Sequence, residues 1–216
     1  MLNRIIKISI VTVILFFGFY HYSHASFTIS RPATNNIGLV GHWTFDGKNV
    51  VNGVALDSSA SGNNGNLVNI ATSTFYSAGK IGQGFNFDGV DDYVNVPSSS
   101  VFNFAASGGF SYFTWFKKDT VCSSVEGNEV FANRFGSDHS VYTWWFGCQD
   151  TAGSYPNKLI IQTAQDGVGN KGIVRSANVI NDGAWHYGGW VYDVSANTVS
   201  LYLDVAFQGA STTAFT

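Results

Sequence analysis

The chain has 216 residues, of which 12% are charged and 16% aromatic, with 24 glycines and a formal net charge of −3 at pH 7. This length suits one medium-sized domain preceded by a targeting segment, because a single β-sandwich can reach about 200 residues, and the composition is typical of a β-rich extracellular protein. The sequence contains no cluster of lysine and arginine, which argues against nucleic acid as a partner, since electrostatic binding to phosphates needs one.

Residues 1–25 have the pattern of a secretory signal peptide. Arg4 and Lys7 precede an uncharged run of 13 residues, and small residues follow, with the expected cleavage after Ala25. The run is short for a membrane-spanning helix, which needs about 20 residues, although an uncleaved anchor is the alternative. We therefore predict a secreted or cell-surface protein that has no membrane span once the segment is removed.

The remaining chain reads as a polar connector, residues 26–37, followed by one domain, residues 38–216. Within the domain, short apolar runs alternate with clusters of Gly, Asn, Asp and Ser, and this alternation is typical of strands and turns. No segment has a convincing helical period. The predicted strands are residues 39–45, 82–87, 92–96, 110–118, 129–135, 140–147, 158–164, 171–176, 185–193 and 198–205.

The alternation along the predicted strands indicates buried sheet faces. Val199, Leu201 and Leu203 share one face of their strand, so that face should be covered. Residues 140–147 carry aromatic side chains on both faces, so this strand is either covered on both sides or offers rings to a ligand. The fold class that follows is all-β, an antiparallel two-sheet jelly-roll sandwich.

The two cysteines, Cys122 and Cys148, lie 26 positions apart in a chain that we expect to be exported. We predict that they form a disulfide, with two buried free thiols as the alternative. In the chain-entropy model, closing a loop of this size stabilises the fold by roughly 3 kcal/mol.

Residues 85–96 hold three carboxylates in a short stretch. We predict a hairpin that reverses at Asp88 and Gly89, with Asp91 and Asp92 keeping its tip in water. The side chains expected to enter the sandwich are Phe85 and Phe87 on one strand and Val94 and Val96 on the next.

Five motifs in order resemble the laminin-G-like jelly-roll domains of the concanavalin A-like lectin and glucanase superfamily. The resemblance covers about residues 38–216, nearly the whole chain after the targeting segment, and implies a jelly-roll fold. The motifs are "LVGHWTFDG", "LDSSASGNNGNL", "GKIGQGFNFDGVDDYVNVP", "GGFSYFTWFKKD" and "DGAWHYGGWVYDVSANTVSLYLDV".

Two features depart from the family pattern. Val205 follows Asp204 where the family usually has Asp-Gly, so the tight turn there is in doubt. Family members also continue to a last strand that returns beside the first, whereas this chain stops at "FQGASTTAFT". We therefore expect a C-terminally truncated domain in which residues 39–45 lack a neighbouring strand.

A glucanase activity would need a pair of carboxylates facing one cleft, about 5 Å apart. The chain contains only two glutamates, Glu126 and Glu129, and a spacing of three on a strand would point them to opposite faces. We therefore predict a protein that is not an enzyme, with a glycoside hydrolase as the remaining alternative.

Calcium is the predicted metal, because hard cations take oxygen ligands at turns. The candidate ligands are Asp57, Asp88 and Asp91, and the similarity to pentraxins adds Asp138. The alternative at each position is an Asx-turn, in which the carboxylate binds its own backbone.

A glycan site is predicted at Arg134, Tyr142, Trp144 and Trp145, because aromatic rings stack on sugars and polar groups hold hydroxyls. Core packing is the alternative for each tryptophan. Four other tryptophans are predicted to lie in or near the core, and His186 is predicted to be structural. Those four are Trp43, Trp115, Trp185 and Trp190.

The sequence therefore predicts an exported, non-enzymatic module that binds a glycan or a cell-surface protein, with a calcium ion as a candidate cofactor. The alternative from another class is a structural or adhesive domain of a longer cell-surface protein, which has no small ligand.

Overall fold

A computed structural model describes residues 38–70, 76–99, 102, 109–122, 128–134, 143–149, 154–165 and 169–212. Residues from Gly38 onward form one compact unit. The described part is all-β with antiparallel pairing, apart from 3-10 structure at Gly47–Asn49 and at Phe102. The predicted all-β class is therefore confirmed.

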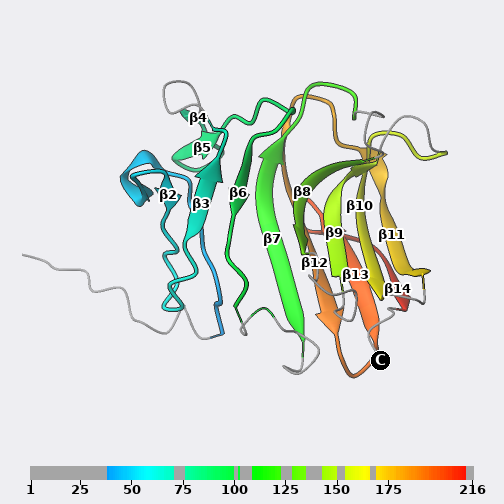
Figure 1. Cartoon of the computed structure of the whole chain (residues 1–216). Helices are drawn as coiled ribbons and strands as arrows, with labels where there is room; N and C mark the ends of the chain where they lie inside the picture. The colour runs from blue at the N-terminus through cyan, green and yellow to red at the C-terminus, as the bar shows by residue number, and fades with distance from the viewer. Residues whose placement is uncertain are drawn as a thin grey trace, which may run out of the picture. The chain divides into compact units, whose positions relative to one another are not determined.

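Three sheets of four strands and one of two make up the described fold (Figure 1). The first sheet has the order β1, β2, β3, β6 and the small one pairs β4 with β5. The other two have the orders β11, β10, β9, β8 and β14, β13, β12, β7. The bounds of these strands are Val50–Val51 (β1), Val54–Ala55 (β2), Gly65–Val68 (β3), Tyr76–Ala78 (β4), Gln83–Phe85 (β5), Tyr93–Asn95 (β6), Phe110–Lys117 (β7), Asn128–Arg134 (β8), Thr143–Gln149 (β9), Lys158–Gln165 (β10), Gly169–Val179 (β11), Trp185–Asp193 (β12), Thr198–Leu203 (β13) and Ala206–Thr212 (β14).

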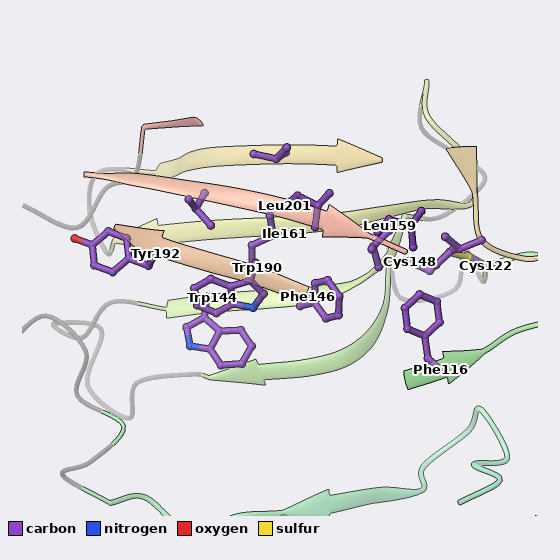
Figure 2. Packing of buried hydrophobic residues seen from close by; sticks show 14 residues of the cluster. Phe116, Cys122, Trp144, Phe146, Cys148, Leu159, Ile161, Trp190, Tyr192 and Leu201 are labelled. Carbon is purple, nitrogen blue, oxygen red and sulfur yellow. A yellow bond between two sulfur atoms is a disulfide. The ribbon is translucent and has the colours of Figure 1, made fainter. Parts of the chain in front are cut away.

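The main hydrophobic core lies between the sheet that contains β9 and β10 and the sheet that contains β12 and β13 (Figure 2). Val199, Leu201 and Leu203 are all buried while Ser200 and Tyr202 are half-buried, which confirms the predicted alternation. Each fully buried large apolar side chain contributes about 1.5–3 kcal/mol. This arrangement is that of a β-sandwich.

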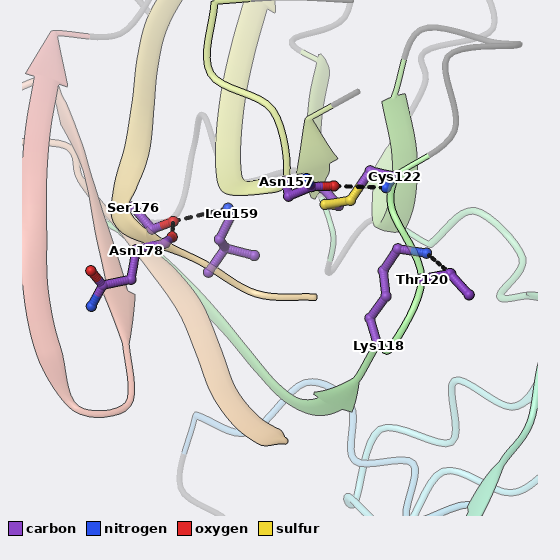
Figure 3. The surroundings of a disulfide bond; sticks show 8 residues. Lys118, Thr120, Cys122, Asn157, Leu159, Ser176 and Asn178 are labelled. Atoms are coloured by element: carbon purple, nitrogen blue, oxygen red, sulfur yellow. Dashed lines mark hydrogen bonds between the residues drawn. A yellow bond between two sulfur atoms is a disulfide. The ribbon is translucent and has the colours of Figure 1, made fainter. Parts of the chain in front are cut away.

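The predicted disulfide between Cys122 and Cys148 is present, with both residues buried and their Cα atoms 6.0 Å apart (Figure 3). It joins the segment after β7 to β9. The amide N–H of Cys122 donates to the side-chain oxygen of Asn157, 2.9 Å away, so a turn before β10 is held at the same place.

The N-terminal part of the domain differs from the prediction. Residues 39–45 lie in none of the described strands. The hairpin predicted for residues 85–96 is wrong, because β5 pairs with β4 and β6 pairs with β3. The carboxylate of Asp88 accepts the amide N–H groups of Val90 and Asp91, so the connecting loop satisfies its own backbone and forms no ladder.

The doubted turn after β13 forms with Val205 in place. Asp204 and Val205 have φ angles of 50° and 69° and join β13 to β14 as a two-residue loop. Positive φ at both positions is the pattern of a type I′ turn, whose twist suits a hairpin.

Candidate functional site

The predicted glycan residues do not assemble into an exposed platform. Trp144 is only 8% exposed and packs between Phe110, Tyr112 and Trp190, so its assignment to a sugar-stacking surface is wrong. The cause is strand parity, because Trp144 shares its face with Phe146 and Cys148, which are buried.

The other three predicted residues are placed as follows. Trp145 is half-buried and adjacent to Trp144 on the strand, so it points to the opposite face of the sheet. Arg134 pairs with Trp144 in the backbone register. Tyr142 lies outside the described residues.

A different set of aromatic side chains gathers on the outer face of the sheet that contains β7 and β12, and we name this set the aromatic row. Neighbouring ring centroids are 5.0–6.2 Å apart across four adjacent strands. The members are Phe113 and Trp115 of β7, Tyr187 of β12, Tyr202 of β13 and Phe207 of β14.

Strand parity and register produce the aromatic row. On β7, Phe113 and Trp115 alternate with inward-facing residues, and Trp115 is opposite Tyr187 on β12. Gly189 stands opposite both Phe113 and Tyr202, and Tyr202 stands opposite Phe207.

Gly189 makes room for the ring of Phe113. A Cβ atom at Gly189 would lie only 2.2 Å from Cδ1 of Phe113, so the ring occupies the space that a side chain would fill. From this position it stacks on Tyr187, with an interplanar angle of 17°, and also reaches Tyr202. An aromatic ring that covers a strand glycine in this way links the strands of the sheet.

The aromatic row is accessible to solvent. Phe113 is 38% exposed, Trp115 39% and Phe207 60%. Trp115 was predicted to be a core or near-core residue, and that prediction is wrong, whereas Trp190 is buried as predicted and Trp43 and Trp185 are half-buried. Tyr187 and Tyr202, between them, are half-buried. A continuous row of rings that is exposed at both ends is unusual for a domain surface with no partner.

A lysine side chain lies against the row. The Nζ atom of Lys80 lies 5.4 Å from the ring centroid of Trp115, within cation–π range. Beside the row, the outward positions on β7 and β13 include Ser111 and Ser200. The row is thus bordered by hydroxyl groups and an ammonium group that could bind polar atoms of a ligand.

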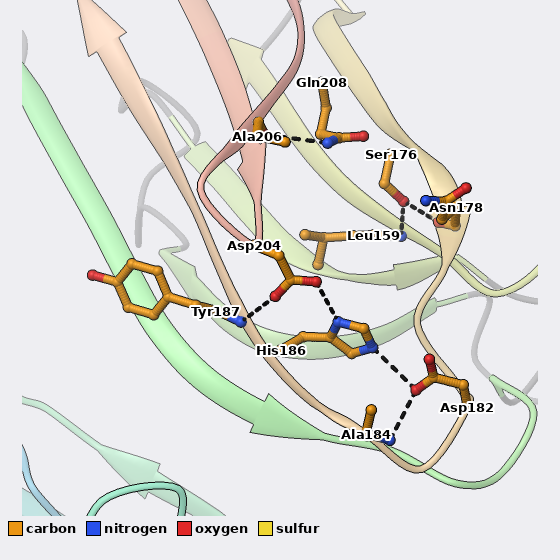
Figure 4. A network of polar contacts seen from close by, with 10 residues as sticks. All are labelled: Leu159, Ser176, Asn178, Asp182, Ala184, His186, Tyr187, Asp204, Ala206 and Gln208. Carbon is orange, nitrogen blue, oxygen red and sulfur yellow. Dashed lines mark hydrogen bonds and ion pairs between the residues drawn. The ribbon is translucent and has the colours of Figure 1, made fainter.

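A polar network lies beside the backbone of Tyr187 (Figure 4). Nδ1 of His186 is 2.8 Å from a carboxylate oxygen of Asp204, and Nε2 is 3.1 Å from a carboxylate oxygen of Asp182. Burial lowers the pKa of His186, but the hydrogen bonds to Asp204 and Asp182 outweigh it and raise that pKa above its usual value. His186 is therefore held in place by two carboxylates, and its predicted structural role stays a prediction.

The acidic loop between β5 and β6 brings together Asp88, Asp91 and Asp92, each with a carboxylate oxygen within 4.8 Å of the others. Asp92 was missing from the predicted ligands. The amide N–H of Val90, above all, holds the pKa of Asp88 below its usual range. Asp91 accepts a hydrogen bond from the side-chain amide of Asn69. A cation with oxygen ligands fits this donor set, because three like charges meet there.

Asp57 has a structural role in the loop before β3. Its two carboxylate oxygens accept the amide N–H groups of His42, Ser59 and Asn63 and the hydroxyl of Ser59, at 2.7–2.8 Å. Partial burial raises its pKa, but these hydrogen bonds outweigh burial and lower it. Four donors fill the lone-pair positions of one carboxylate, so Asp57 has none to spare for a metal. Asp138 lies outside the described residues.

Sequence reasoning missed most of the row, namely Phe113, Tyr187, Tyr202 and Phe207. The sequence did contain a signal, because Ser111 and Lys117 share one face of the strand with Phe113 and Trp115. Polar residues on a face indicate that it points outward.

No helix within the described ranges is long and apolar enough to cross a membrane. Comparison of the chain with protein-family models, with curated proteins and with solved structures found no match. The resemblance to laminin-G-like domains therefore stays a prediction.

Proposed function

We propose that the protein is an exported, non-enzymatic recognition module that binds a carbohydrate chain on the aromatic row. The observation that carries the proposal is the row itself, in which exposed rings on β7 and β14 are joined by the half-buried rings of Tyr187 and Tyr202 on the two strands between them. Aromatic rings stack on the apolar faces of sugars, and polar groups at the border fix the hydroxyls.

The dimensions of the row favour an extended chain as the ligand. Four strands span three interstrand gaps, which is about 14 Å from β7 to β14. This length exceeds one sugar ring, so several units of a polysaccharide can stack at once. Rings that already contact one another lose little side-chain entropy on binding, and this preorganisation favours affinity.

Two observations support export. The N-terminal sequence has the pattern of a signal peptide, and the buried disulfide between Cys122 and Cys148 is of a kind that persists in oxidising compartments.

We also propose that a structural calcium ion binds the acidic loop of Asp88, Asp91 and Asp92. The ion would neutralise three converging carboxylates. At a concentration of 100 times its dissociation constant, it would stabilise the fold by about 2.7 kcal/mol. Calcium should then raise the melting temperature of the wild type and have less effect on Asp92→Asn. Equal melting of the wild type in calcium and in chelator contradicts the proposal.

Affinity electrophoresis tests carbohydrate binding. The full chain is run through gels that contain a soluble β-glucan, xylan, galactomannan or polyuronate, and at least one of these should retard it. Phe207→Ala should weaken the retardation, since Phe207 is the most exposed ring of the row. Tyr93→Ala is the matched control, because Tyr93 is an aromatic residue of β6 outside the row and is 51% exposed. If both variants lose retardation equally, the assignment of the binding site to the row is contradicted.

A second candidate function is adhesion to a protein surface. Val205, in the β13–β14 turn, and Phe207, near the beginning of β14, are exposed. Because β14 is an edge strand of its sheet, such apolar side chains suit a protein contact. Self-association in sedimentation experiments without retardation by any polysaccharide favours adhesion over carbohydrate binding.

A further inference from the structure

The imidazole of His186 is held between two carboxylates. Its Nδ1 atom faces Asp204 and its Nε2 atom faces Asp182, both within hydrogen-bond distance (Figure 4). Carboxylates only accept hydrogen bonds, and a neutral imidazole has one N–H group. Only the protonated ring can therefore donate to both carboxylates at once.

Asp204 connects this histidine to the aromatic row. Its second carboxylate oxygen accepts the amide N–H of Tyr187 at 2.9 Å, and its own amide N–H donates to the carbonyl oxygen of Tyr187 at 2.8 Å. The ring of Tyr187 lies between those of Phe113 and Trp115. One carboxylate thus serves both the buried histidine and the backbone of the central residue of the row.

The groups around the ring come from three elements besides its own strand. The loop before β12 contributes Asp182 and the β13–β14 turn contributes Asp204; these are the two charged groups that act on the imidazole. Strand β7 contributes the apolar ring of Phe116, whose centroid is 5.8 Å from that of the His186 ring. The next residue, Lys117, is paired with Trp185 and lies on the outward face of β7, not on the face of Phe116. Burial opposes protonation of His186, and Asp182 and Asp204 favour it.

We propose that His186, Asp182 and Asp204 make the aromatic row sensitive to pH. With the ring protonated, the β11–β12 loop and the β13–β14 turn are tied to β12 and the row is ordered. With the ring neutral, one nitrogen faces a carboxylate oxygen with no proton between them. In either neutral tautomer Asp204 loses its charge-assisted hydrogen bond to the protonated ring, so it is held less firmly, and so is the backbone of Tyr187.

This inference rests on the proposed function, because the affected affinity is that of the row for a carbohydrate chain. We expect binding to weaken by about tenfold as pH rises through the pKa of His186, which corresponds to the loss of one charge-assisted hydrogen bond. At lower pH, where the ring stays protonated, affinity should be constant until the carboxylates take up protons.

The first arm of the test needs no ligand. NMR spectra of the full chain from about pH 5 to 9 follow the ring of His186 and the amide of Tyr187. Both should change with one midpoint, above about 6.5. Asp182→Asn should lower that midpoint, because it removes one partner and leaves Asp204 in place. Asp193→Asn is the matched control, since Asp193 accepts backbone hydrogen bonds at the β12–β13 turn in the same sheet.

The second arm measures binding in gels that contain the polysaccharides named above, at about pH 6 and pH 8.5. The wild type should be retarded less at the higher pH, and His186→Gln should be retarded equally at both. A Tyr187 amide that does not respond while His186 titrates, or equal retardation of the wild type at both pH values, overturns the inference. A shared midpoint without retardation by any polysaccharide supports the pH coupling and refutes the proposed function.

Discussion

Replacing Val205 with glycine should stabilise the protein. Val205 has a φ of 69° in the two-residue turn between β13 and β14, and a β-branched residue in this left-handed region costs about 1–2 kcal/mol. Glycine removes that cost but loses about 0.5–1 kcal/mol of chain entropy on folding. Because the Val205 side chain is 85% exposed, little burial is given up. The free energy of unfolding should therefore rise by about 1 kcal/mol.

Urea denaturation of Val205→Gly and of Val90→Gly separates backbone strain from other effects of the substitution. Val90 is also 85% exposed and lies in a loop, but its φ is not positive. The control variant should lose about 0.5–1 kcal/mol, because it gains only chain entropy in the unfolded state. If both variants lose stability equally, the strain at Val205 is not relieved by glycine and the reasoning is wrong.

Three further predictions concern the row, the disulfide and pH. Gly189→Ala should cost about 1–3 kcal/mol through overpacking, because the added Cβ atom would meet both the ring of Phe113 and the backbone oxygen of Tyr112. It should also weaken retardation in affinity gels, and unchanged stability and binding would contradict the close packing at Gly189. Replacing Cys122 and Cys148 together with alanine should lower the free energy of unfolding by about 3 kcal/mol in urea, and a loss below 1 kcal/mol contradicts the entropic estimate. Calorimetry across pH should show two losses of folding stability. The stability contributed by His186 is complete below its unfolded pKa of about 6.5 and is lost as pH rises through its raised folded pKa. The stability contributed by Asp182 is complete above its unfolded pKa of about 3.8 and is lost as pH falls through its lowered folded pKa. A melting temperature that is flat on the alkaline side contradicts the role of His186.

The C-terminal half of the domain follows its sequence closely. The strand predicted at residues 185–193 has the observed bounds of β12, and the alternation of Val199, Leu201 and Leu203 identifies the buried face of β13. The two cysteines pair as predicted. In these segments the local alternation and the tertiary burial agree, so sequence reasoning succeeds.

Pairing partners in the N-terminal half could not be read from the sequence. The stretch around Asp88 contains a turn between two short apolar runs, which is the usual pattern of a hairpin. Instead, β5 and β6 each pair with an earlier strand, and such long-range choices leave no local signal. Residues 39–45 show the same limit, since an apolar alternating run does not specify a partner.

The site was misplaced because strands with aromatic residues on both faces do not reveal which face is buried. Trp144 was assigned to the surface and Trp115 to the interior, and the structure reverses both. Lys117 lies on the same face of β7 as Trp115, and this polar residue indicates that the face points outward. The bridge from His186 to Asp204 depends on tertiary contact across 18 positions, which periodicity cannot detect.

NMR chemical-shift mapping tests the central claim, that the aromatic row is the binding surface, most directly. The full chain is titrated with an oligosaccharide prepared from the polysaccharide that retards it most. The ring resonances of Trp115, Tyr187 and Phe207 should shift together, while those of Trp145 and Tyr155, outside the row, stay in place. Shifts confined to Trp145 and Tyr155 would contradict the account.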